Sequence, residues 1–159
     1  MDGFHLYRCE LDAMPDAEEA HRRRGAHWTF DGEKFAARLR QARRDGEGSF
    51  PSFDHAVGDP VEDDIQVSKA HRLVLVEGNY LLLRGLEPWD PGLRGLFDEE
   101  WAIDCPLGEC AERVRRRHRA TGLSEAAALE RVEGNDLPNA RLVAERCPWD
   151  RVDCVIKSV

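Results

Sequence analysis

The sequence predicts an α/β protein built as a parallel sheet with helices on both faces. One observation is a continuous apolar strand, Arg72 to Glu77, with the run Leu-Val-Leu-Val at 73–76. Such runs are typical of parallel sheets, because helices cover both faces of each strand. A second observation is that strand-like and helix-like segments alternate along the chain, which favours right-handed crossovers. We therefore expect Arg72–Glu77 to be a central strand.

Three segments precede that strand. A short helix is expected from Asp16 to Arg24, because its acids come early and its arginines late, the order that suits the helix dipole. Asp31 can cap a second helix, which the glycines at 46 and 48 would end. The stretch 46–64 is rich in Gly, Pro, Ser and Asp, so it predicts an extended loop. Long loops usually serve function.

The remaining elements follow the apolar strand without a linker or an internal repeat. They are a turn region and short helix over Pro88–Leu96, a strand at Trp101–Asp104, a helix over Leu107–Arg119, a helix capped by Ser124 and running through Val132, a helix capped by Asp136 with Pro138 in its first turn, and a last strand at Val152–Ile156. We expect residues 1–159 to form one domain, with the arginine-rich helix near 107–120 as a lid-like feature.

Composition excludes several classes of protein. With 42% hydrophobic and 34% charged residues the chain is typical of a soluble globular protein. A net charge of −8 and a pI near 5.3 argue against a general binder of nucleic acid or anionic membranes. No apolar run approaches the roughly 20 residues that span a bilayer, and no signal core is found, so a cytoplasmic protein is expected. Five cysteines without zinc-site spacing predict reduced, structural thiols.

An acid stands at the end of the apolar strand. Glu77 is followed by Gly78, Asn79 and Tyr80, and ligands of open parallel sheets collect where the strands end. Glu77 could hold Mg²⁺ beside a triphosphate, while Asn79 and Tyr80 present polar groups to the same crevice. The alternative is an ordinary strand end whose acid is solvated or paired.

The opening segment, Asp2-Gly3-Phe4-His5, has the pattern of a second strand end. Asp2 could take a proton from a substrate hydroxyl, and His5 could orient that carboxylate or bind substrate. A frayed terminus in water is the alternative interpretation.

Two further groups of residues could contact a ligand. In the loop 49–55, Asp54 and His55 lie beside aromatic residues, a combination that suits a polyol or ribose, although a plain surface turn is the alternative. On the arginine-rich helix, Arg113 and Arg117 are four residues apart and share a face. That face could close over phosphates, or it could be a solvated helix end.

Taken in order, these segments resemble the P-loop kinases of the uridine kinase, phosphoribulokinase and pantothenate kinase group. Within that group the resemblance is to the nucleoside/nucleotide kinase-like branch, which includes fructose transport system kinases. The matching segments are MDGFHL at 1–6, RRGAHWTFD at 23–31, PSFDHAVGDPVEDDI at 51–65, LVLVEGNYLLL at 73–83, PWD at 88–90, LFDEEWAID at 96–104, the arginine helix, and NDLPNARLV at 135–143.

The resemblance implies a three-layer P-loop NTPase-like sheet, ATP and Mg²⁺ as cofactors, and transfer of the γ-phosphoryl group to a hydroxyl of a sugar, nucleoside or related metabolite. It implies that Asp2 is the catalytic base and Glu77 the acid near the metal. The other site residues that it implies are His5, Asp54, His55 and Tyr80 for the acceptor, and Arg113 and Arg117 for the lid.

One part of the family pattern is missing from these residues. Such kinases begin with a strand, a loop of the form Gly-x-x-x-x-Gly-Lys-Ser/Thr and a helix, yet none of the lysines at 34, 69 and 157 follows a glycine. We therefore expect an N-terminally truncated kinase domain with negligible activity, because nothing cradles the β- and γ-phosphates. The missing strand should leave exposed edges that favour aggregation or pairing, including a homo-oligomer.

Other interpretations stay open. The chain could be a non-catalytic kinase remnant that binds a sugar or nucleoside, or an oligomeric scaffold. The acceptor of a kinase could be a furanose, a hexose or a pantothenate-like chain.

Overall fold

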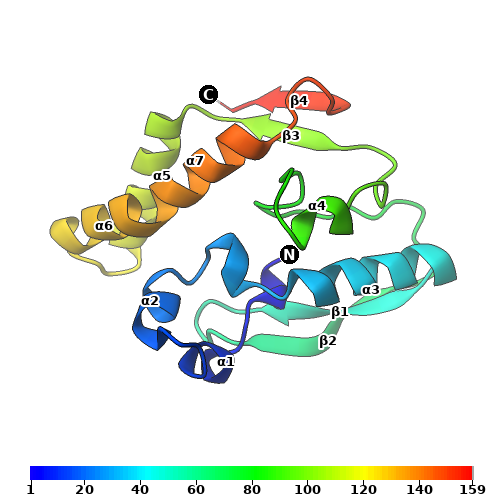
Figure 1. The fold of residues 1–159 in the computed structure, drawn as a ribbon, viewed down its shortest axis with the longest axis horizontal. Helices are drawn as coiled ribbons and strands as arrows, with labels where there is room; N and C mark the ends of the chain where they lie inside the picture. Colours follow the sequence, from blue (N-terminus) through cyan, green and yellow to red (C-terminus); the bar gives the residue numbers. More distant parts are fainter. Residues whose placement is uncertain (159) are drawn as a thin grey trace.

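The computed structural model describes residues 1–158 and has an α/β fold (Figure 1). In chain order its elements are the 3-10 turn η1 (Asp2–Phe4), α1 (Arg8–Asp12), α2 (Ala17–Arg22), the 3-10 turn η2 (His27–Thr29), α3 (Gly32–Asp45), β1 (Gly48–Phe53), β2 (Pro60–Val67), α4 (Trp89–Gly92), β3 (Trp101–Asp104), α5 (Leu107–Ala120), α6 (Glu125–Arg131), the π turn η3 (Val132–Asp136), α7 (Leu137–Arg146) and β4 (Cys154–Lys157). The predicted fold class is confirmed.

The strands form two small sheets. β3 and β4 are parallel, with Trp101 opposite Cys154 and Asp104 opposite Lys157, whereas β1 and β2 are antiparallel. Figure 1 shows α3 lying along the β1–β2 pair, the β3–β4 pair at the opposite end of the molecule, and α5, α6 and α7 together on one side.

The helices before the first strand follow the sequence signals. The Asp16 side chain accepts a hydrogen bond from Glu19 N at the start of α2, and Asp31 accepts one from Lys34 N at the start of α3. α3 ends where Gly46 takes a φ of 73°, a conformation that glycine adopts without steric cost. Both expected helices are confirmed because caps are local signals.

The stretch predicted as an extended loop is instead a β-hairpin. β1 pairs with β2 across the turn at 54–59, with a register shift between Phe50 and Ser52. Two acids of β2 pair with α3, since Lys34 Nζ lies 2.5 Å from Glu62 Oε1 and Arg38 Nη2 lies 3.4 Å from Asp63 Oδ1. Prolines are tolerated in such a pair because edge strands can lack a donor.

The predicted central strand, Arg72–Glu77, is not a strand in this structure. The side chains of Leu73 and Leu75 are 76% and 85% exposed, and Val76 packs against the core from a half-buried position. Among residues 1–158 each of the two sheets has two strands, and neither includes this segment, so its backbone has no partner strand. An apolar run alone therefore did not specify the strand.

The C-terminal elements match their predictions in type and differ in detail. Ser124 caps α6 through Ala127 N, and the last strand is Cys154–Lys157. Asp136 does not cap α7, because the helix continues through the π turn and the Asp136 carboxylate pairs with His118. No helix among residues 1–158 is long and apolar enough to cross a membrane.

The core holds the N-terminal segment against α3 and residues 80–93. Its buried members are Phe4, Phe30, Phe35, Ala36, Tyr80, Leu81, Leu83, Trp89 and Leu93. Phe4 meets the Phe35 ring edge-on at 4.9 Å, and Trp89 lies 5.7 Å from Tyr80. This packing fixes the position of the residues on either side of Phe4, which include Asp2 and His5.

Candidate active site

Asp2, His5 and His55 come together at the edge of the core. η1 leaves the Asp2 carboxylate half exposed, and its Oδ2 lies 3.8 Å from Nε2 of His55. The main-chain oxygen of Asp2 accepts a hydrogen bond from Nδ1 of His5 at 2.8 Å. The structure therefore joins two segments, 2–5 and 54–55, that are about fifty residues apart in the chain.

His5 is sandwiched between two aromatic rings. Its imidazole lies 4.0 Å from the ring of Phe30 and stacks at 4.5 Å on Phe53. Burial lowers the pKa of His5 below its ordinary 6.5, and its interactions with Asp2 offset only part of that shift. A carbonyl oxygen can only accept, so Nδ1 carries the proton and Nε2 of the neutral ring remains an acceptor.

A tight turn carries Asp54 and His55. The main-chain oxygen of Asp54 accepts hydrogen bonds from Val57 N and Gly58 N, and its side chain accepts one from Ala56 N at 2.8 Å. One carboxylate oxygen of Asp54 is therefore used by the turn. The side chain of His55 is 82% exposed and lies edge-on to Phe53.

Glu77 lies beside the opening segment. The terminal ammonium of Met1 donates to the main-chain oxygen of Glu77 at 2.6 Å, and a side chain at Gly78 would overlap the side chain of Met1. Burial lowers the pKa of this ammonium, while the charges of Asp2 and Glu77 oppose the shift. The side chain of Glu77 is exposed. The two predicted carboxylates therefore share one neighbourhood.

Tyr80 is a core residue, so the expectation that it contacts substrate is corrected. Its side chain has no exposed surface, and its hydroxyl donates to the main-chain oxygen of Gly25 at 2.5 Å. Burial raises the pKa of the Tyr80 phenol well above its ordinary value, which keeps it neutral. Asn79, next to it, is exposed.

The arginine helix α5 packs on α6, η3 and α7. Arg113 bonds to Glu109 at 2.7 Å and to Ser158 Oγ at 2.8 Å, and Arg117 is exposed. Figure 1 shows α5 beside α6 and α7, apart from the N-terminus that η1 follows. The structure therefore does not bring Arg113 and Arg117 to Asp2. Cys110 and Val114 of α5 are half-buried.

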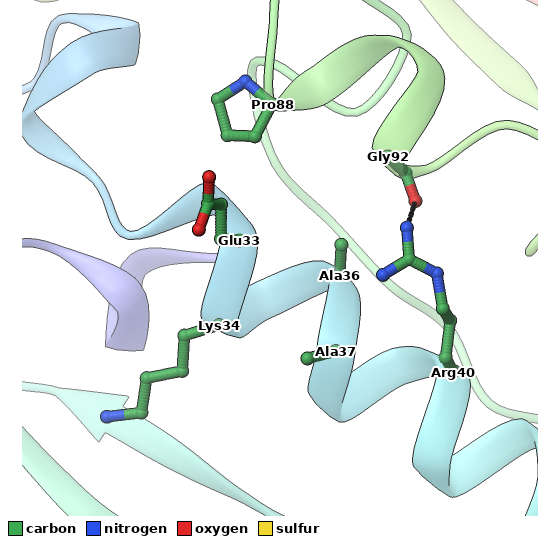
Figure 2. A pocket seen from close by; sticks show the side chains of 7 residues that line it. All are labelled: Glu33, Lys34, Ala36, Ala37, Arg40, Pro88 and Gly92. Carbon is green, nitrogen blue, oxygen red and sulfur yellow. Dashed lines mark hydrogen bonds between the residues drawn. The ribbon is translucent and has the colours of Figure 1, made fainter.

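Two open cavities lie away from these residues. Figure 2 shows one of about 470 Å³ at the start of α3, lined by Glu33, Lys34, Ala36, Ala37, Arg40, Pro88 and Gly92. Arg40 closes one side of it by donating to the main-chain oxygen of Gly92 at 2.7 Å. The second, of about 690 Å³, lies between the end of α3 and the strands β1 and β2. Neither is lined by a predicted site residue.

Sequence reasoning missed Arg24. This side chain is 15% exposed and donates to the main-chain oxygens of Gly58 and Leu6, at 2.5 and 2.8 Å. Arg24 is the last of three consecutive arginines. The one sequence signal for it is that it lies in RRGAHWTFD at 23–31, a segment that matches the kinase family.

The curated proteins that are similar to this chain include two described as kinases. One described as "ATP-dependent kinase-like protein notR'", from Aspergillus versicolor, is 41% identical over 156 residues, covering 93% of this chain and 90% of that protein. A "putative uridine kinase" of Schizosaccharomyces pombe is 42% identical over 147 residues, covering 90% of this chain but only 62% of that protein. No family model matches the chain.

The solved structures that are similar in fold include two crystal structures of kinases described as putative. That of a "putative fructose transport system kinase" from Silicibacter sp. superposes with a TM-score of 0.86 at 31% identity, covering 98% of this chain and 71% of that one. That of YFH7 from Saccharomyces cerevisiae, described as "a putative P-loop containing kinase with a circular permutation", has a TM-score of 0.83 at 30% identity. This chain spans 56% of the YFH7 chain.

Proposed function

The chain belongs to the P-loop kinase family, in the branch of uridine kinase-like and ATP-dependent kinase-like proteins, and on that premise we propose that it forms the acceptor side of a small-molecule kinase. The reaction is transfer of the γ-phosphoryl group of ATP to an alcohol. The observation that supports this most is the meeting of Asp2, His5 and His55 beside exposed Glu77.

In the proposed step, Asp2 is the general base. The acceptor hydroxyl loses its proton to the Asp2 carboxylate while its oxygen forms a bond to the γ-phosphorus, and the bond to the β–γ bridging oxygen breaks, which releases ADP. Exposure of the Asp2 carboxylate leaves it accessible to a hydroxyl, and Nε2 of His55 lies 3.8 Å from its Oδ2.

The acceptor would lie against the aromatic stack. The faces of His5 and Phe53 are stacked on each other, so the acceptor would meet the edge of this stack, where Nε2 of His5 can accept a hydrogen bond from a hydroxyl. His55 and the free carboxylate oxygen of Asp54 add polar partners. This combination suits a furanose, a hexose or a related polyol.

Glu77 is the proposed ligand of Mg²⁺, a cation that neutralises charge on the phosphates when it is bound. Within residues 1–158 no group of three or more His, Cys, Asp or Glu side chains could hold a metal by itself. Mg²⁺ usually keeps several waters and takes one or two carboxylates plus phosphates, so an exposed Glu77 near Asp2 fits the ion. Arg113 and Arg117 would reach the phosphates only after α5 moves, as a lid does.

Turnover also needs a phosphate-binding loop, and the 159 residues do not contain its Gly-Lys pattern. We therefore expect negligible turnover by this chain alone. The test measures ATP consumption with a panel of sugars, nucleosides and pantothenate, for this chain and for the chain joined to a strand, phosphate loop and helix. Acceptor-dependent turnover only in the joined protein supports the proposal. Turnover in neither, with both proteins folded, contradicts it.

A second candidate is a non-catalytic sugar- or nucleoside-binding protein. It is favoured by the meeting of Asp2, His5 and His55 in a sequence without the Gly-Lys pattern of a phosphate loop. Saturable binding of one panel compound by both proteins, without turnover by either, would select it.

A further inference from the structure

Arg24 lies between the opening segment and the turn at 54–59. Its Nη1 donates to the main-chain oxygen of Gly58 at 2.5 Å, and its Nη2 donates to that of Leu6 at 2.8 Å. Nη2 also lies 3.2 Å from Oδ1 of Asp59, which in turn accepts from Arg8 N. One guanidinium therefore joins both segments that carry the candidate site, and charge-assisted hydrogen bonds of this kind are the stronger ones.

The same guanidinium lies against the aromatic stack. Its central carbon is 5.7 Å from the centre of the Phe53 ring, within range of a cation–π interaction. Phe53 stacks on His5 and meets His55 edge-on. Loss of the Arg24 side chain would therefore free the turn at 54–59 and the Phe53 ring, which lies between the imidazoles of His5 and His55.

The main chain of Arg24 is bonded to the helices that support α5. Its carbonyl oxygen accepts from Nδ2 of Asn135 at 3.2 Å and from Nη2 of Arg131 at 3.3 Å. Asn135 is only 3% exposed, and the adjacent Asp136 carboxylate lies 2.8 Å from Nε2 of His118, near the end of α5. Polar contacts and the peptide link between Asn135 and Asp136 thus connect the turn to the arginine helix.

From these contacts we propose that Arg24 is a positioning residue, which fixes the turn at 54–59 against Asp2–Leu6 and ties both to the helices that support α5. The inference rests on the proposed function for its catalytic meaning, because the turn carries Asp54 and His55. The contacts of Arg24 with the turn do not depend on that function. Arg24 contacts no reacting atom in this account and acts through the groups that it holds.

The test compares Arg24→Gln with Arg44→Gln, a matched change of an exposed arginine that pairs with its neighbour Asp45. The probes are the amides of Val57 and Gly58, which donate to Asp54 O at 3.0 and 2.7 Å. Hydrogen exchange followed by NMR should be about tenfold faster or more at both amides in Arg24→Gln, since charged hydrogen bonds contribute about 1.5–3 kcal/mol and tenfold is about 1.4 kcal/mol. Amides in the middle of α3 should keep their rates in both variants.

The stack supplies a spectroscopic signature. The ring protons of His5 experience the ring currents of Phe30 and Phe53, so their chemical shifts should move in Arg24→Gln and not in Arg44→Gln. Unchanged exchange at Val57 and Gly58, or an equal acceleration at every amide, overturns the proposal. If Arg24→Gln fails to fold, Asp59→Asn, which removes the same carboxylate partner, must show the local acceleration or the proposal is wrong.

The catalytic consequence is read separately. In the chain joined to a phosphate loop, Arg24→Gln should raise the KM for the acceptor about tenfold or more while the KM for ATP changes little. An equal change in both KM values contradicts positioning of the acceptor side. A wild-type protein without turnover refutes the proposed function, whereas the exchange result still decides the role of Arg24 in the turn.

Discussion

Exposure separates the polar residues of the site into two groups. Asp2, Asp54, His55 and Glu77 keep carboxylates or an imidazole at the surface, where a ligand can reach them. Tyr80 gives its only polar atom to the main chain and belongs to the core. Chemistry and packing therefore predict different results when residues of each group are changed.

Replacing Tyr80 by Phe should reduce stability without affecting the site. The change leaves the carbonyl of Gly25 without the donor described above, which costs about 1–2 kcal/mol of the free energy of unfolding. Urea denaturation measures this, with Tyr7→Phe as control, because the Tyr7 hydroxyl bonds to a carboxylate that Lys34 also neutralises. Equal stability of Tyr80→Phe and wild type would contradict the structural role.

The protein should lose stability as the pH falls below about 6.5. Burial holds the pKa values of His5 and His27 below their ordinary 6.5, so the unfolded chain binds protons that the folded chain does not. The stability due to these neutral imidazoles is present above pH 6.5 and is lost as the pH falls through the lowered values. Unfolding free energies from pH 7.5 to 5 should show a weaker decline in His5→Asn. The same slope in both proteins would count against a buried, neutral His5.

At the scale of elements, η1 approaches the first strand closely. A side chain at Gly3 would overlap the carbonyl oxygen of Pro51, whereas one at Gly108 in α5 would meet no atom. Gly3→Ala should therefore destabilise the protein by more than 1 kcal/mol, as overpacking does. Gly108→Ala should stabilise it by about 0.5–1 kcal/mol. Thermal melting of both variants checks the pair, and a Gly3→Ala protein as stable as wild type would contradict the contact.

The longer helices and the strands β3 and β4 were predictable from sequence, whereas the hairpin of β1 and β2 was not. Asp31 and Gly46 bound α3 through local hydrogen bonds and backbone conformation, which a short window of sequence contains. The hairpin of β1 and β2 depends on pairing across a turn and on Lys34 and Arg38 of another element. The run at 73–76 has strand composition, but a strand also needs a neighbour.

For the molecule as a whole, the proximity of Asp2, His55 and Glu77 could be anticipated only through the family resemblance. Composition and periodicity do not specify which distant segments meet. The role of Arg24 was not predictable from the sequence either. Its partners are the main-chain carbonyl groups of Leu6 and Gly58, and every residue type has such a group.

The exposed apolar segment at 73–75 should make the protein associate with itself. Large exposed apolar patches favour aggregation, so replacing both Leu73 and Leu75 by Lys should lower self-association with little change in Tm. Val76→Lys is the contrasting variant, because Val76 packs on the core and its replacement should lower Tm. Light scattering over a range of concentrations and thermal melting check both. Unchanged association in the double variant would assign the contact to another surface.

We propose above that this chain forms the acceptor side of a kinase with Asp2 as its base. Steady-state phosphoryl transfer by the chain joined to a phosphate loop, with Asp2 present or replaced by Asn, tests this proposal. Asp2→Asn should lower kcat by ~10²-fold or more, with a similar KM for ATP and unchanged folding, because His5 bonds to the main chain of residue 2. Turnover by Asp2→Asn equal to that of the parent protein would contradict it.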